Sequence, residues 1–325
     1  MPRPIMLGIV GDSGCGKTTI TRGLVRVLGD EWVTGFCTDD YHRYDRKQRA
    51  ERAITPLHPD CNHLDILAQH LGHLRRKEAI LKPTYQHGDG TFGPPDYLEP
   101  TRFMIVEGLL SFYSPELRDP FDVRVYLAPP EDLRRQWKVH RDCTRRGYST
   151  DQVLAELDRR EPDSESFIRP QRHHADIVVS FQPAREGQDP NKLDAKVTLR
   201  DSLPHPDFSG LLADGSEDGL ILTEKPGAEE LYVPGEISDE RAGAIEEMIW
   251  SKLHFAGELK KEKLGEYTVG TDLHRSNSLA IVQMLILYQL IAARVGIATG
   301  QSSVRGWDKS AMDELLGSEE SATAM

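Results

Sequence analysis

The sequence predicts an α/β fold in which a mostly parallel sheet is flanked by helices, followed by a mixed β/α extension. Two observations carry this prediction. Short apolar runs alternate with helical patterns through the first half of the chain, and a glycine-rich loop directly follows the first apolar run. Strand–helix alternation of this kind is typical of a parallel sheet with helices on both faces.

The individual elements of the core follow from apolar patterning. Each predicted strand is a short apolar run that fits a buried parallel strand. The predicted strands cover residues 5–10, 32–38, 102–108 and 123–129. The helices between them show helical periodicity, and the first ends at Gly29. The predicted helices cover residues 18–29, 61–78 and 131–147.

The character of the sequence changes after about residue 175. Shorter strands with Gly, Pro and Asp turns between them come first, and helical stretches at 238–256 and 277–295 follow. We therefore expect a core over 1–182, an extension over 183–300 packed on the same domain, and a polar, flexible tail over 301–325.

An apolar stretch at 279–295 raises the question of a membrane span. Gln283, Gln289 and Arg294 interrupt it, and it is shorter than the usual spanning length. We expect a buried helix and no membrane partner. The N-terminus enters a strand pattern without an apolar leader region, which favours a cytoplasmic protein.

Net charge and cysteine pattern exclude some classes of molecule as binding partners of the protein. The formal net charge is −12 over 325 residues, so no broad basic surface is expected and nucleic acid is a poor candidate partner. The four cysteines contain no CxxC pair, and the pattern is neither a disulfide framework nor a zinc site. A small-molecule substrate is the expected partner.

The stretch GDSGCGKTT at 11–19 matches a phosphate-binding P-loop. Its glycines allow the backbone N–H groups to surround phosphate oxygens, and Lys17 adds a positive charge towards the β and γ phosphates. A strand precedes the loop and a helix follows it, as this mechanism requires. The predicted nucleotide-binding residues are Gly11, Asp12, Ser13, Gly14, Cys15, Gly16, Lys17, Thr18 and Thr19.

Two oxygen ligands for Mg²⁺ are predicted. The Thr18 hydroxyl follows the loop lysine, and Glu107 comes directly after the apolar run MIV, at the carboxyl end of a predicted strand. Hydroxyl and carboxylate oxygens are ligands that Mg²⁺ accepts. ATP and Mg²⁺ are therefore the expected nucleotide and metal, and no NKxD-type motif of GTPases is present.

The stretch FCTDDYHRYDR at 36–46 places two carboxylates at the carboxyl end of a strand. Asp39 or Asp40 there could take a proton from a substrate hydroxyl as it attacks the γ-phosphorus. Basic side chains follow at once, which suggests an acceptor with its own anionic group. A solvated charged loop is the alternative explanation of this run.

These pieces together resemble the phosphoribulokinase and uridine kinase family of P-loop kinases. The similar segments are GDSGCGKTT, CTDDYHRYDR, PTYQHGDG at 83–90, IVEGLL and WKVHRDCTRRGYS at 137–149, with a looser match over 183–235. The resemblance implies a kinase that phosphorylates the C1 hydroxyl of ribulose 5-phosphate with ATP. It also suggests a homodimer. The pathway that the product feeds stays open between carbon fixation and another route of pentose metabolism.

The resemblance implies a role for each matching residue. Asp39 matches the catalytic base. The implied substrate-binding residues are His42, Arg46, Tyr85, His87, Arg141 and Arg146. Lys138 matches a basic residue near the transferred phosphoryl group, and Asp142 matches a catalytic carboxylate. Independently, the basic residues between 138 and 146 suggest a helical lid that neutralises phosphate charge.

Several alternatives stay open at this point. A related kinase acting on uridine or another pentose phosphate would need a different acceptor site, and a non-catalytic regulator would bind ATP without transfer. The resemblance also suggests that Cys15 and Cys37 form a redox pair, because photosynthetic members of the family carry cysteines at these positions. Two unregulated buried thiols are the simpler explanation.

Overall fold

The computed structural model describes residues 2–184, 187, 189, 191–208, 219–253 and 259–316. The chain divides into two compact units. We call the first the parallel-sheet unit; it comprises Arg3–Lys17 and Trp32–Ala175. We call the second the antiparallel-sheet unit; it holds Thr18–Glu31 and the described residues from Asp176 onward. These units differ from the predicted division at residues 182 and 183, because most of the first helix groups with the C-terminal residues.

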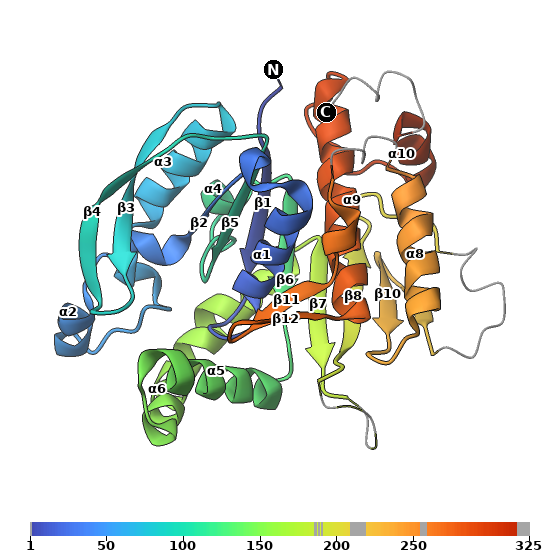
Figure 1. Ribbon diagram of the computed structural model, residues 1–325. Coiled ribbons are helices and arrows are strands. Elements are labelled where there is room, and N and C mark those ends of the chain that lie inside the picture. Colours follow the sequence, from blue (N-terminus) through green and yellow to red (C-terminus); the bar gives the residue numbers. More distant parts are fainter. Residues whose placement is uncertain are drawn as a thin grey trace. The chain divides into compact units, whose positions relative to one another are not determined.

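Four parallel strands form the centre of the parallel-sheet unit, in the order β2-β5-β1-β6 (Figure 1). They are β1 (Ile5–Val10), β2 (Val33–Cys37), β5 (Phe103–Gly108) and β6 (Val123–Leu127). All residues of β1 are buried, as expected for a central strand of a covered parallel sheet. Its neighbour β5 pairs with it in register from Ile5 opposite Phe103 to Val10 opposite Gly108.

The other elements of this unit follow these strands. The helices are α2 (Arg46–Glu51), α3 (Leu64–Arg75), α4 (Pro115–Arg118), α5 (Glu131–Arg146) and α6 (Thr150–Asp163). Short 3₁₀ segments are η1 (Asp30–Trp32), which straddles the division, η2 (Thr38–Tyr41), η3 (Pro59–Cys61) and η5 (Arg169–His174); η4 (Ser164–Ile168) is a π-helix. A separate antiparallel hairpin, β3 (Ile80–Gln86) with β4 (Thr91–Leu98), packs beside α3 (Figure 1).

The antiparallel-sheet unit contains strands in the order β7-β8-β10-β9. They are β7 (Ile177–Gln182), β8 (Asp194–Arg200), β9 (Ile221–Lys225) and β10 (Ala228–Val233), with a separate hairpin of β11 (Glu266–Val269) and β12 (Asp272–Arg275). Its helices are α1 (Lys17–Leu28), α8 (Asp239–Ser251), α9 (Asn277–Ala298) and α10 (Lys309–Leu316). The predicted strands and helices are confirmed, and so is the α/β fold class; neither separate hairpin was predicted as such.

Helix α9 is the apolar stretch that the sequence singles out. It is long and apolar enough to span a membrane, but 94% of its most apolar window is buried inside the protein, which is typical of a core helix. Two polar side chains of α9 form hydrogen bonds inside the protein. Gln283 accepts from the Gly265 N–H at 2.8 Å, and Gln289 donates to the Pro204 carbonyl at 2.5 Å. The predicted buried helix is confirmed.

The polar C-terminal stretch requires a correction. Residues 301–325 were expected to be a flexible tail, but α10 forms at Lys309–Leu316 with Met312 and Leu316 buried. Two apolar side chains four residues apart suffice to hold a short helix against the protein. Residues 317–325 lie outside the described residues.

Two glycines in helices of the antiparallel-sheet unit give opposite predictions for stability. A β-carbon at Gly23 in α1 would overlap the Gln283 amide, whereas one at Gly243 in α8 would meet no atom within 4 Å. Gly23→Ala should lower the free energy of unfolding by about 1–3 kcal/mol, since displacing Gln283 leaves the Gly265 N–H unsatisfied. Gly243→Ala should raise it by about 0.4–1 kcal/mol. Urea denaturation measures both, and shifts of the same sign would contradict this packing.

Candidate active site

The phosphate loop follows β1 and has the backbone that its glycines predict. Gly14 and Gly16 have φ angles of +89° and +98°, which a residue with a β-carbon adopts only at a cost. The Lys17 ammonium donates to the carbonyls of Gly11 at 2.6 Å and Asp12 at 2.9 Å, so its charge lies over the loop. Thr18 and Thr19 follow in the first turn of α1, and both are exposed.

The second predicted loop begins where β2 ends, and its two aspartates have different surroundings. Asp40 accepts hydrogen bonds from the Lys82 ammonium at 2.6 Å and from the Tyr85 N–H at 2.9 Å. It therefore anchors η2 to the β3–β4 hairpin. Asp39 has no hydrogen-bond donor to its carboxylate among the described residues, and its nearest ion-pair partner is His87 Nε2 at 3.9 Å.

The Asp39 carboxylate is ionised in this setting. Burial on its own raises the pKa of Asp39, but the nearby positive groups outweigh burial and the pKa is lowered. The groups that lower it are His42, His87, Lys17 and Arg160. Asp39 thus lies close enough to the phosphate-loop lysine to feel its charge, and it is ready to accept a proton.

Close packing fixes the position of this loop. The last residue of β5 is Gly108, and a β-carbon there would overlap the Thr38 hydroxyl that precedes Asp39. Only glycine allows η2 to approach the strand end so closely. The sheet therefore determines the place of Asp39.

His42 is buried and its tautomer is fixed by Asn62. The Asn62 amide nitrogen donates to the carbonyls of Pro56 and His58, so its oxygen faces His42 Nδ1 at 2.8 Å and accepts from it. Burial lowers the pKa of His42, and Arg49 lowers it further, although Asp39 acts in the opposite direction. The imidazole is therefore neutral near pH 7, and Nε2 remains as an acceptor.

Arg46 and Arg49 lie one turn apart in α2 but have different surroundings. Arg46 is exposed, and its guanidinium donates to the carbonyls of His87 at 2.7 Å and Gly88 at 3.3 Å, so it supports the β3–β4 turn. Arg49, which the sequence analysis missed, is 9% exposed and donates to the Tyr44 carbonyl and the Tyr85 hydroxyl. No carboxylate of the described residues forms an ion pair with Arg49.

The ring of Tyr85 is the centre of an aromatic cluster. His42 lies 4.9 Å and His87 5.2 Å from it, and the Arg49 guanidinium is 5.1 Å from the ring centre. The segment PTYQHGDG at 83–90, which the resemblance assigns to substrate binding, thus lies next to the loop that carries Asp39.

The predicted lid helix is α5, and its basic residues converge on one carboxylate. Asp142 is 4% exposed; it pairs with the Lys138 ammonium, with Arg141 at 2.9 Å and with Arg146 at 3.5 Å. The pKa of Lys138 is lowered to about 8, chiefly by burial and also by Arg141, against the opposite effect of Asp142. Sequence reasoning predicted the cluster but not that Asp142 would hold it together.

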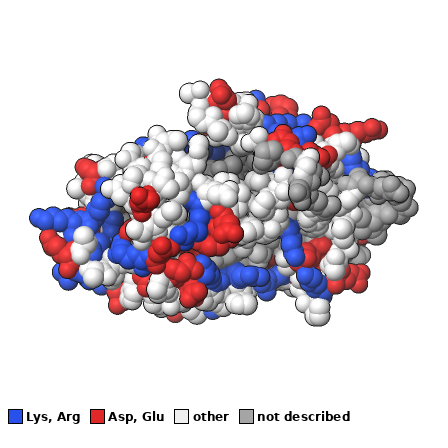
Figure 2. Space-filling model, turned by 90° about the horizontal axis from the view of Figure 1, so that it is seen from below, with Lys and Arg blue, Asp and Glu red and all other residues white. Residues whose placement is uncertain are grey.

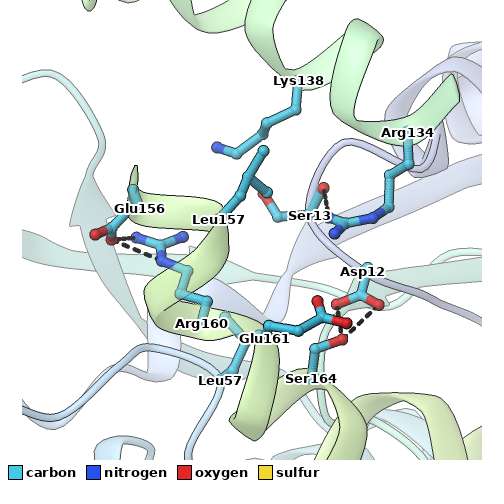
Figure 3. Close-up of a pocket in the computed structure, with 10 residues that line it drawn as sticks. All are labelled: Asp12, Ser13, Leu57, Arg134, Lys138, Glu156, Leu157, Arg160, Glu161 and Ser164. Atoms are coloured by element: carbon cyan, nitrogen blue, oxygen red, sulfur yellow. Dashed lines mark hydrogen bonds and ion pairs between the residues drawn. The ribbon is translucent and has the colours of Figure 1, made fainter. Parts of the chain in front are cut away.

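A pocket between the phosphate loop, α5 and α6 connects these elements (Figure 3). Lys138 and Arg160 extend into it from the two helices. The lining residues are Asp12, Ser13, Leu57, Arg134, Lys138, Glu156, Leu157, Arg160, Glu161 and Ser164. Acidic and basic side chains are interspersed on the protein face in Figure 2, so this face carries no broad basic surface. The basic groups relevant to phosphate binding are therefore those that line this pocket.

The remaining predicted residues are Glu107 and the two cysteines. Glu107 lies in β5 opposite Cys37 of β2, near the end of both strands. Burial raises the pKa of the Cys15 thiol and, more strongly, that of Cys37, where Asp39 and Glu107 add to the effect. Both cysteines are free thiols. Their pairing stays a prediction, as do the metal-binding roles of Thr18 and Glu107.

Comparison with known proteins places this geometry among sugar-phosphate and nucleoside kinases. The sequence model of the "Phosphoribulokinase / Uridine kinase family" matches residues 6–186. A phosphoribulokinase of Synechocystis sp. is 32% identical over 273 residues, covering 79% of this chain and 82% of the relative. A uridine kinase of Chlamydia pneumoniae is 31% identical over 182 residues, covering 54% of this chain and 81% of the relative.

One solved structure supports the fold. The phosphoribulokinase from Rhodobacter spheroides superposes with a TM-score of 0.56 at 19% identity, covering 75% of this chain and 94% of that chain. At this level of identity the likeness concerns the fold alone. The sequence match adds the family, whose P-loop implies ATP as the nucleotide.

The pKa of Lys138 predicts the alkaline side of the pH profile. Below about pH 8 the ammonium is protonated and can neutralise phosphate charge, and above it the charge is lost. We expect kcat/KM to fall above pH 8 in the unaltered protein. In Lys138→Arg this fall should move upward, because a guanidinium stays charged. The exposed Lys47→Arg is the matched control, and an unmoved fall in Lys138→Arg would rule out this assignment.

Proposed function

We propose, on the premise that the chain belongs to the phosphoribulokinase and uridine kinase family, that it phosphorylates the C1 hydroxyl of ribulose 5-phosphate with ATP. The products are ribulose 1,5-bisphosphate and ADP. One observation carries the proposal: an ionised Asp39 lies within the field of Lys17, and the buried Arg49, which pairs with no carboxylate of the described residues, contacts Tyr85 in the adjoining aromatic cluster. A phosphorylated sugar acceptor needs a base that takes the proton of its hydroxyl and a cation that binds its own phosphate.

Asp39 acts as the general base in this proposal. Its carboxylate accepts the proton of the C1 hydroxyl while the hydroxyl oxygen attacks the γ-phosphorus and the bond to the ADP oxygen breaks. Phosphoryl transfer depends mainly on positioning and on charge neutralisation. Because no residue in the described part of the chain donates a hydrogen bond to the Asp39 carboxylate, its oxygens are available to the acceptor.

Lys17 and the cations of α5 neutralise the transferred group. Lys17 lies over the phosphate loop, and Lys138 with Arg141 is held by the buried Asp142. Because one carboxylate supports several cations, their charges stay at the site instead of separating by repulsion. Mg²⁺ would supply further neutralisation of the ATP phosphates, and the Thr18 hydroxyl and Glu107 carboxylate have the oxygen donors it prefers.

Arg49 is the group we assign to the acceptor phosphate. A buried guanidinium without a carboxylate partner is costly, and an anionic ligand removes that cost. Tyr85 accepts from Arg49 at 2.5 Å and orients it. Arg46 supports the neighbouring turn, and the neutral His42 suits a sugar hydroxyl better than a phosphate.

A nucleoside kinase is the alternative within the same family. A nucleoside carries no phosphate, so it gives no reason for a buried arginine that pairs with no carboxylate of the described residues. The homodimer, the cytoplasmic location and a role in carbon fixation remain predictions, as does redox control through Cys15 and Cys37.

A substrate panel tests the proposal directly. Ribulose 5-phosphate, ribose 5-phosphate and uridine are each supplied with ATP and Mg²⁺, and ADP release is followed. The highest kcat/KM is expected for ribulose 5-phosphate. Faster turnover of uridine would replace the proposal with the nucleoside alternative, and no turnover of any acceptor would favour a regulator.

Asp39→Asn tests the base. The substitution should lower kcat by a factor on the order of 10²–10⁴ while ATP still binds, because an amide accepts no proton. Steady-state kinetics and a nucleotide-binding titration measure the two effects. Asp60→Asn, whose side chain is 81% exposed, is the control. Near-normal kcat in Asp39→Asn would remove the proposed role.

Arg49→Met tests the phosphate contact. It should raise the KM for ribulose 5-phosphate about 10- to 100-fold, since a hydrogen bond to a charged group contributes about 1.5–3 kcal/mol. The KM for ATP should stay close to its original value. Arg52→Met is the matched control. Arg52 lies at the C-terminal end of α2, and its guanidinium stacks on the ring of Tyr44. Equal changes in both variants would argue against a specific phosphate contact.

A further inference from the structure

The phosphate loop contains a carboxylate that the proposed chemistry does not use. Asp12 is 7% exposed, and its two carboxylate oxygens lie 2.8 and 2.7 Å from the Ser164 hydroxyl. Ser164 is the only hydrogen-bond donor to this carboxylate among the residues that the structure describes. A negative charge at this position is a problem, because the loop must also receive the negatively charged phosphates of ATP.

Ser164 comes from an unusual backbone segment. It opens the π-helix η4, which continues α6 directly after Asp163 and two residues after Pro162, and it is 2% exposed. Pro162 cannot donate a helical hydrogen bond, and π-helical turns are frequent at functional sites. Figure 3 shows the Asp12 and Ser164 side chains pointing towards each other at the edge of the pocket.

Two arginines add positive charge on the same side of the loop. Arg134 donates to the Ser13 carbonyl at 2.8 Å and pairs with Glu131. Arg169 lies 3.8 Å from the Asp12 carboxylate, too far for a hydrogen bond, and pairs closely with Glu161 at 2.5 Å. These contacts favour an orientation of Asp12 towards α5 and η4 and away from Lys17.

We propose that Ser164 is a positioning residue that holds the Asp12 carboxylate away from the phosphate cradle. Without the Ser164 hydroxyl, the carboxylate keeps only Arg169, at 3.8 Å and engaged with Glu161, as a neighbouring cation. It can then turn towards the loop N–H groups and the Lys17 ammonium. It would then compete with the ATP phosphates for the same donors. The serine therefore sets the affinity for ATP without touching it.

The test compares two serines in the same π-helix. Ser164→Ala should weaken ATP binding about 10- to 100-fold, while the KM of the acceptor stays within about twofold. Ser166 lies two residues further along, and its hydroxyl donates to the Pro162 carbonyl, so Ser166→Ala should bind ATP as the unaltered protein does. Titration calorimetry with ATP measures affinity, and thermal unfolding checks that each variant is folded.

A second pair of variants separates positioning from a general structural effect. In Asp12→Asn the competing charge is gone, so ATP should bind at least as tightly as before. Adding Ser164→Ala to Asp12→Asn should then change the affinity less than threefold. Unchanged binding in Ser164→Ala, weaker binding in Asp12→Asn, or an equal loss from Ser164→Ala in both backgrounds would overturn the proposal.

The outcome does not depend on which sugar is the acceptor. The deciding measurement is the affinity for ATP, so the substrate panel can fail while this proposal stands. If Ser164→Ala does not fold, the affinity of Asp12→Asn still decides the matter, because weaker ATP binding there would contradict a competing carboxylate.

Discussion

The constraint on which the site depends is the order β2-β5-β1 in the parallel sheet. All three strands run in the same direction, so their carboxyl ends meet at one edge. The phosphate loop follows β1, Glu107 lies near the end of β5, and Asp39 follows β2. The close approach of Thr38 to Gly108 then fixes the distance between the base and the sheet. Residues far apart in the sequence share a site because of strand order.

Charge balance is the second requirement, and buried carboxylates provide it. Asp142 collects Lys138 and Arg141, and Asp40 neutralises the buried Lys82. The Asp40–Lys82 pair leaves no net charge that would destabilise the fold, whereas Asp142 with Lys138 and Arg141 leaves an excess of positive charge. The exception is Arg49, whose positive charge has no such partner among the described residues. This uncompensated charge is the one that the proposed function assigns to the phosphate of the acceptor.

Much of this arrangement could be predicted from the sequence, because the core strands are apolar runs and the phosphate loop has fixed glycine spacing. Arg49 could not, since an arginine in the charged segment YDRKQRAE carries no sign that it will be buried while Arg46 stays exposed. The contrast between Asp39 and Asp40 also arises from tertiary contacts, here with Lys82 and the backbone of Tyr85. Helix α10 escaped prediction because its apolar residues are few.

The same burial that organises the site bears on the two cysteines. Disulfide formation requires attack by a thiolate, and burial raises the pKa of both Cys15 and Cys37. Near neutral pH both sulfurs are therefore protonated in this conformation. Cys37 lies between the carboxylates of Asp39 and Glu107, which disfavour its thiolate further. Cys37 is partly buried and directly precedes η2, so a movement of η2 that lowers its pKa would also displace the proposed base.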